Sequence, residues 1–293
     1  HMVTAAVAYD VLKADHPAAL AKTLDTLRAH PSYERLWKPK LEDVPAADRD
    51  VYLFMLAARW ADDIRGEKEF DRPTWHYIGT GFVAPGEPPT VTLPKVPEPN
   101  AVTAIRDNAR RLTAPDAADR AVAATWVFHL VGDIQQPLHA TSRVTAAAPE
   151  GDRGGNGFWV KANPAGAPVN LHAFWDDFIL GSERFRDARN RATELRLRPE
   201  FARDKLTELG DRDPAAWAAE SLKLGFEVVH QGGKLEGGSG KLSAVPLPAG
   251  YAKACQPVAE RRAGLGGYRL AQVLAAAFEK PAEQPGKIII REQ

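Results

Sequence analysis

The 293-residue sequence is poor in cysteine and has no excess of charge of either sign. Cys255 is the single cysteine, so an intrachain disulfide and a cysteine-based zinc site are both excluded, and a metal would have to be held by His and Asp. Lys plus Arg and Asp plus Glu each total 38, which gives a formal net charge of zero. Proteins that grip duplex DNA usually carry a basic surplus, so any affinity for phosphate here must be local.

Apolar residues recur at helical spacing, and the segments between them are rich in proline and glycine. Strand signals are confined to Phe158–Lys161 and Pro168–Asn170, which predict one small hairpin, while 83–99 holds six prolines and reads as a surface loop. No repeat or linker divides the chain, so we predict an all-α fold with a single domain over 1–293. Helices are expected at 4–13, 17–30, 45–65, 100–112, 116–135, 171–180, 182–209, 214–230 and 268–279.

The expected helix 116–135 carries polar residues on an apolar face. His129 and Asp133 are four residues apart and share that face with Val122 and Trp126. Burying a His and an Asp there is costly unless something satisfies them. A shared metal does so, and so does a His–Asp hydrogen bond within the core. This pair alone favours neither explanation.

The same spacing recurs in the expected helix 171–180, where His172 and Asp176 lie within an apolar string. Two such pairs on different helices suggest one metal centre that takes ligands from both helices. Pro137 ends the first helix, and His139 follows where the chain must turn, so it can face an adjacent metal.

Two further candidates lie upstream. Asp62 and Arg65 are three residues apart on one helix face; such a pair is usually a surface ion pair, but the Arg can also hold a phosphate beside metals. His76 follows Trp75 in an aromatic string. Three other histidines, which we expect to be exposed or to cap helices, are His16, His30 and His230.

His and Asp ligands without Cys suit zinc, which often keeps a position open for water. Closely spaced metals favour an in-line displacement at phosphorus, because one lowers the pKa of the attacking water and another stabilises the leaving oxygen. Three Zn²⁺ would bring about six positive charges against three carboxylates, so the site would attract phosphate in a neutral protein. The residues therefore predict a zinc-dependent phosphodiesterase.

Several strings, in this order, resemble the zinc-dependent S1/P1 nuclease family, which shares its fold with bacterial zinc phospholipase C. The resemblance runs from residue 1 to about residue 280, and a tail pattern from Leu247 through Arg262 to Arg269 also looks like the family. The strings are Trp60-Ala-Asp-Asp-Ile-Arg, Trp75-His-Tyr-Ile, His129-Leu-Val-Gly-Asp-Ile-Gln-Gln-Pro-Leu-His, Gly151-Asp-Arg-Gly-Gly-Asn and Asn170-Leu-His-Ala-Phe-Trp-Asp.

This resemblance implies a ligand set for each metal. The first zinc would be held by Asp62, His76, His129 and Asp133, and a second, more exposed one by His139, His172 and Asp176. A third would share Asp133 and use an N-terminal Trp and a nearby His. His1 aligns with that His, but the Trp is absent from this sequence. Three zinc ions are therefore expected, or two if the N-terminal site is incomplete.

The resemblance also implies an endonuclease and 3′-nucleotidase that cleaves single-stranded DNA and RNA to 5′-phosphates. Asp62 would orient or deprotonate the attacking water, and Arg65 would hold the phosphate. A base could stack on Tyr77 or Trp175, although core packing explains either aromatic equally well. Other candidate substrate contacts are Gly79, where the family often has a base-reading Asp; Asp177, where an Asn often stands; and Asn156 of the glycine-rich string.

Two alternatives stay open, namely a zinc phosphodiesterase of the phospholipase C type and a non-catalytic zinc-binding protein. No apolar run approaches the roughly 18 residues of a membrane span, and no protein partner is implied. The resemblance implies a secreted or periplasmic protein. The sequence opens without a charged-then-apolar leader, so a signal peptide would already have been removed.

Overall fold

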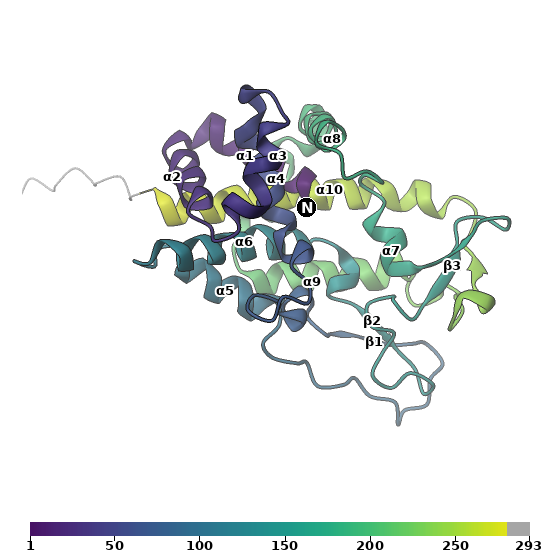
Figure 1. Cartoon of the computed structure of the whole chain (residues 1–293). Helices are drawn as coiled ribbons and strands as arrows, with labels where there is room; N and C mark the ends of the chain where they lie inside the picture. The colour runs from purple at the N-terminus through teal and green to yellow at the C-terminus, as the bar shows by residue number, and fades with distance from the viewer. Residues whose placement is uncertain (280–293) are drawn as a thin grey trace, which may run out of the picture.

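The computed structural model describes residues 1–279, so the part of the predicted domain at residues 280–293 lies outside the described residues. The fold is mostly helical, as predicted, with two small sheets. The long helix α10 (Tyr251–Phe278) crosses the molecule, and the N-terminus lies near the middle of the view (Figure 1). No helix among the described residues is long and apolar enough to cross a membrane.

Four helices form the centre of the molecule. They are α1 (Met2–Asp15), α4 (Arg49–Asp63), α6 (Ala117–Asp133) and α10, and α1 packs against α10 and α4. Their side chains supply most of the largest buried hydrophobic cluster. Helix α6 is buried along most of its length, which explains why polar residues on it need partners.

Several helices, both central and outer, begin where a polar side chain caps them. Asn100, Asp116, Asn170 and Asp213 each accept a hydrogen bond from the backbone of the first turn, which satisfies donors that a helix start leaves free. The outer helices are α2 (Pro17–Arg28), α3 (Lys38–Glu42), α5 (Ala101–Arg111), α7 (Leu171–Asp176), α8 (Phe185–Leu197) and α9 (Pro214–Leu224).

The predicted hairpin is confirmed, and the sheets also contain strands that the sequence did not reveal. β3 (Trp159–Lys161) pairs antiparallel with β4 (Pro168–Asn170), with Val160 opposite Val169. β5 (Val245–Pro246) adds to β3 in parallel. A separate parallel pair joins β1 (Gly81–Val83) to β2 (Ser142–Val144). The unpredicted strands are two or three residues long, too short for an alternating pattern.

Some helix limits differ from the prediction. The expected helix 182–209 is wrong, because α8 ends at Leu197 and short 3-10 turns continue to Gly210. Pro199 explains the break, since it forces Arg198 into an extended conformation with ψ 121°. Helix α10 begins at Tyr251 rather than at residue 268, because burial in the core outweighs the local cost of its glycines and of Pro257.

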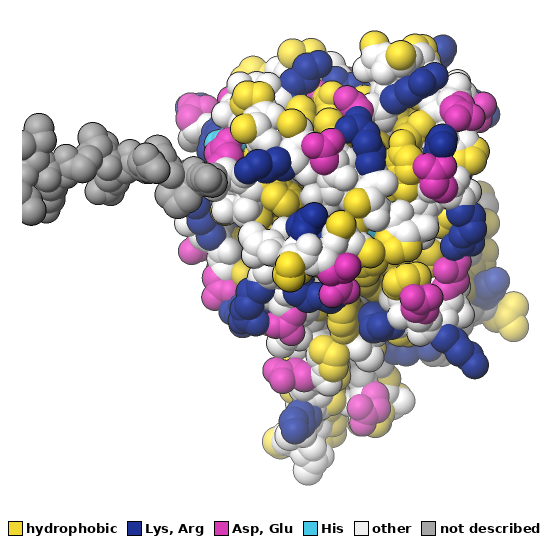
Figure 2. Space-filling model, turned by 60° about the vertical axis from the view of Figure 1, so that its left-hand side comes forward, with side chains coloured by type: hydrophobic (Ala, Val, Ile, Leu, Met, Phe, Trp, Pro, Cys, Tyr) yellow, Lys and Arg dark blue, Asp and Glu magenta, His cyan; other side chains and the backbone are white. Residues whose placement is uncertain are grey.

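Charged side chains are mixed rather than segregated. On the face shown in Figure 2, Lys and Arg are interspersed with Asp and Glu and form no large patch of one sign. This agrees with the neutral composition and leaves phosphate binding to a local site.

The prediction that His30 and His230 are exposed or capping is wrong. His30 is 3% exposed and packs between Trp37 and Trp60. His230 is fully buried against Phe82 and Phe158, and neither of its ring nitrogens has a hydrogen-bond partner among the described residues. Burial lowers the pKa of each ring to about 3.

Buried His230 predicts a loss of stability in acid. Its pKa is lower in the folded protein than the unfolded value of 6.5, so the unfolded chain binds more protons between about pH 3 and pH 6.5. The stability from the neutral ring is therefore present above pH 6.5 and is lost as the pH falls. In metal-free protein, His230→Leu should reduce the drop in unfolding free energy between pH 7.5 and pH 5 by about 2 kcal/mol. Urea unfolding at both pH values measures this, and equal drops in both proteins would contradict it.

Candidate metal centre

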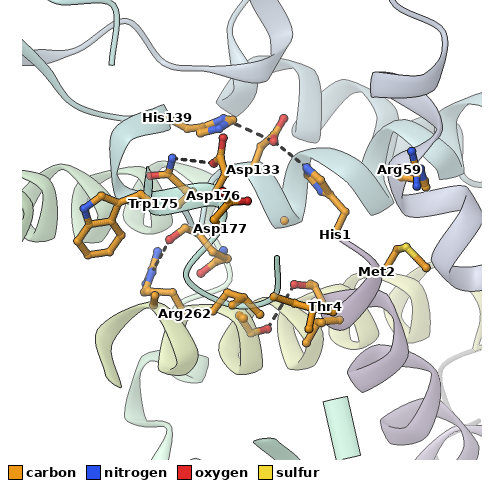
Figure 3. A pocket seen from close by; sticks show the side chains of 18 of the residues that line it. His1, Met2, Thr4, Arg59, Asp133, His139, Trp175, Asp176, Asp177 and Arg262 are labelled. Carbon is orange, nitrogen blue, oxygen red and sulfur yellow. Dashed lines mark hydrogen bonds and ion pairs between the residues drawn. The ribbon is translucent and has the colours of Figure 1, made fainter. Parts of the chain in front are cut away.

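The predicted ligands come together from six separate segments of the chain. Helix ends and tight turns carry most of them, and in Figure 3 His1, Asp133, His139 and Asp176 are close neighbours in one view. They fall into three groups of possible metal ligands, which are Asp62, His76 and His129; His1, His129 and Asp133; and His139, His172 and Asp176.

Three of these residues form the buried part of the centre. His129 Nε2 lies 2.9 Å from His76 Nδ1, and each of these nitrogens lies 3.1 Å from Asp133 Oδ2. His129 Nδ1 donates to the carbonyl of Ala58 at 2.8 Å, so its Nε2 carries a lone pair. A proton on His76 can satisfy part of this triangle, whereas a cation satisfies all three atoms.

The spacing within this triangle also fits zinc. Tetrahedral zinc with bonds of 2.0–2.1 Å separates its ligand atoms by about 3.3 Å. The His and Asp donors, the absence of any cysteine nearby and these separations fit such an ion.

Asp62 connects this centre to a positive side chain. It lies at the end of α4, with Oδ1 3.8 Å from His129 Nε2 and 2.7 Å from Arg65 Nη2. Arg65 is 64% exposed, so its guanidinium pairs with Asp62 and still faces solvent. The ion pair that the spacing allows does form, and it lies at the edge of the candidate metal centre.

A second group is more exposed. His139 and His172 have ring centroids 4.9 Å apart, and His172 Nε2 lies 3.6 Å from Asp176 Oδ2. The short turn Pro137–His139 after α6 presents one ring, and α7 presents the other two residues. The Asp176 side chain is half exposed, so this group opens toward solvent.

His1 approaches the same centre from the start of α1. Its Nε2 lies 3.3 Å from Asp133 Oδ1 and 3.8 Å from Asp62 Oδ2, and its ring stacks on His129 with centroids 3.9 Å apart. Asp133 therefore has one oxygen toward His1 and the other toward His76 and His129. This carboxylate therefore belongs to the group of His1 and also contacts the group of Asp62, His76 and His129, so two groups share it.

Charges within the centre shift the pKa values of its members. Burial alone would raise the pKa of Asp133, but the neighbouring histidines, His129 first, hold it well below its usual range. Burial lowers the pKa of His129 and of His139, which favours the neutral, ligating form. Burial also opposes the charged form of His1, yet the hydrogen bond and charge of Asp133 raise its pKa to about 9.

Two cavities meet at the centre, and both are lined by Arg65, His139, His172 and Asp176. One has a volume of about 520 Å³ and also reaches Asp177. The other has a volume of about 780 Å³, and its lining includes Tyr77, Gly79 and Asn156.

The two candidate stacking aromatics differ. Tyr77 is 41% exposed beside the larger cavity, whereas Trp175 is 2% exposed and donates its indole N–H to Tyr251 Oη. The structure therefore places Trp175 in the core and leaves Tyr77 accessible.

Gly79 is closely covered by the proline-rich loop. Its φ is +78°, and a Cβ atom there would lie 2.5 Å from Pro97 Cδ. The side chain of Asn100 donates to the carbonyl of Pro97, and the amide of Ala101 donates to the carbonyl of Tyr77. This wall of the larger cavity was not visible in the sequence, where 83–99 showed only its prolines.

Together the fold and the site define a mostly helical protein with a His/Asp metal-type centre at the junction of two cavities. Residues 1–279 match the family model S1/P1 Nuclease, and the chain belongs to this family. It is similar to Nuclease S1 of Aspergillus oryzae, with 28% identity over 185 residues. That match covers 58% of this chain and 59% of the relative's length.

Proposed function

We propose that this protein is a zinc-dependent endonuclease with 3′-nucleotidase activity, which hydrolyses single-stranded DNA and RNA to 5′-phosphate products. The observation that carries the proposal is the position of Asp133, whose two oxygens face His1 on one side and His76 and His129 on the other. A further group of His139, His172 and Asp176 lines both cavities. Family membership supports a nuclease over other uses of such a centre. Export from the cytosol is part of the same proposal.

Each group would hold one zinc ion. Asp62, His76, His129 and Asp133 would hold the most buried one, and His139, His172 and Asp176 the most exposed one. His1 and Asp133 would contribute to a third. Bound zinc would supply a lowered pKa for an attacking water and positive charge for the phosphate.

The residues of the chain then have distinct roles. Asp62 is placed to orient the attacking water and to accept its proton, because its carboxylate reaches the centre from the end of α4. Arg65 adjoins Asp62 and remains largely exposed, so its guanidinium can hold the non-bridging oxygens of the phosphate.

An unpaired base fits the larger cavity. Tyr77 offers an exposed aromatic face for stacking, which tolerates any base. Gly79 has no side chain to read a base edge, and Pro97 fills the space next to it. We therefore propose a relaxed base preference. Asn156 is a further contact, and Asp177 adds negative charge to the neighbouring cavity.

Substrate tests on zinc-loaded protein distinguish this proposal from its alternatives. Single-stranded DNA, RNA and a 3′-nucleotide should be hydrolysed, with 5′-phosphate ends on the polymer products. Elemental analysis should find two or three zinc ions per chain. Hydrolysis of a choline phospholipid without nuclease activity would favour the phospholipase reading, and bound zinc without either activity would favour a non-catalytic role.

A further inference from the structure

The exposed group needs restraints, because its members lie near solvent. His139 Nδ1 donates to the carbonyl of His76 at 2.6 Å, and His172 Nδ1 donates to the carbonyl of Gly154 at 2.7 Å. In each ring the backbone bond leaves Nε2 free for a ligand. Both of these partners are main-chain groups, which no substitution removes. Asp176 is the third member, and burial restrains it least.

Asp176 is held by the side-chain amide of Gln136. Gln136 Nε2 donates to Asp176 Oδ1 at 3.1 Å, while Gln136 Oε1 accepts from the amide of Leu138 at 2.6 Å. The second bond fixes the orientation of the amide, because its oxygen is already turned toward a donor. With Oδ1 occupied, the other oxygen of Asp176 faces His172 Nε2 at 3.6 Å. Asp176 is labelled beside His139 and Asp133 in Figure 3.

We propose that Gln136 is a positioning residue for the metal of the exposed group. It holds one oxygen of Asp176 and so presents the other to an ion shared with His139 and His172. The inference rests on the proposed function in one respect, namely that zinc binds at this group. Removing a partner that orients a ligating carboxylate typically weakens metal binding by about 10–100-fold.

A purely structural role for Gln136 is the competing explanation, since its oxygen also caps the turn Pro137–His139 through Leu138. The two roles differ in what they stabilise. Capping the turn supports the fold whether or not metal is present, whereas the bond to Asp176 supports the bound ion. A role through Asp176 therefore requires Asp176 to be present, whereas a role through the turn does not.

The test compares Gln136→Met with Gln256→Met in zinc titrations against a competing chelator. Gln256 is a matched control, because its amide donates to the carboxylate of Glu260 at 3.2 Å on α10, outside the three groups. His172→Ala identifies which zinc affinity belongs to the exposed group. We expect Gln136→Met to weaken that affinity about 10–100-fold, to leave the others unchanged, and to have no further effect in an Asp176→Ala background. Met also removes the acceptor of the Leu138 amide, so a small fall in the metal-free melting temperature is expected as well. Gln256→Met should match the wild type.

Two results would overturn the inference. One is an unchanged affinity at the exposed group in Gln136→Met, and the other is an equal loss of affinity from Gln136→Met in the wild-type and Asp176→Ala backgrounds. Failure of the proposed function gives a different result, because wild-type protein would then bind no zinc in the same titration.

Discussion

Replacing Asp62 with Asn should reduce the turnover of single-stranded DNA by about 10²–10⁴-fold, the usual contribution of a general base. The substitution keeps the size of the side chain and one oxygen, but it removes the charge and the basic site beside Arg65. Most zinc should remain bound, because the other ligands of the buried group are untouched. Turnover and zinc content are measured on the same preparations.

Asp63→Asn provides a matched control on the next residue of α4. Asp63 pairs with Arg59 at 2.8 Å and belongs to none of the three groups, so the same chemical change there should leave turnover near the wild-type value. Comparable zinc content with wild-type turnover in Asp62→Asn would show that the carboxylate has no catalytic role. A loss of stability in Asp62→Asn, with little change in turnover per folded molecule, would indicate a structural role for Asp62.

The residues of the candidate centre could be singled out from the sequence because polar side chains at their positions carry a physical cost. His129 and Asp133 lie four residues apart on a helix that the structure buries, and polar groups there need a partner. His172 and Asp176 repeat the spacing at the end of a short helix. Sequence periodicity reveals a polar residue on an otherwise apolar face of a single helix. Each His–Asp pair could therefore be identified without knowledge of the fold.

The grouping of these ligands depends on contacts between distant segments. Asp133 meets His76 and His1 through tertiary packing, and no local pattern indicates which pairs share an ion. Two hydrogen bonds were missed for the same reason. They join Gln136 to Asp176 and the carbonyl of Gly154 to His172. Gly154 has φ +63° and lies against Leu138, where a Cβ atom would be 2.4 Å from the carbonyl oxygen, so the glycine-rich string was its only sign.

Burial of His30 shows the same limit in the core. In the sequence it lies at the end of the expected helix 17–30, which favoured an exposed or capping ring. Trp37 and Trp60 enclose it instead, and the second of these comes from α4, about 30 residues further along the chain. Helices with clear caps, such as α5 and α6, followed the sequence more closely, because a cap is a local interaction.

Replacing Asp133 with Asn should have the largest effect on metal binding. This carboxylate lies within 3.5 Å of ring nitrogens of His1, His76, His129 and His139. Asn cannot supply a negative charge or two ligating oxygens, so zinc should be lost from both groups that share this residue. Because loss of a direct ligand exceeds the effect of an orienting partner, we expect each affinity to fall by more than about 100-fold.

The thermal stability of the folded protein gives a second measure of the same loss. Zinc that binds the native state raises the melting temperature by mass action, so Asp133→Asn should remove most of the rise seen when zinc is added. Asp177→Asn is the control, because Asp177 lines the smaller cavity but belongs to no ligand group. It should keep its zinc and the full rise in melting temperature. Equal zinc content in the two variants would rule out Asp133 as the shared ligand, and the buried triangle would then be held by hydrogen bonds alone.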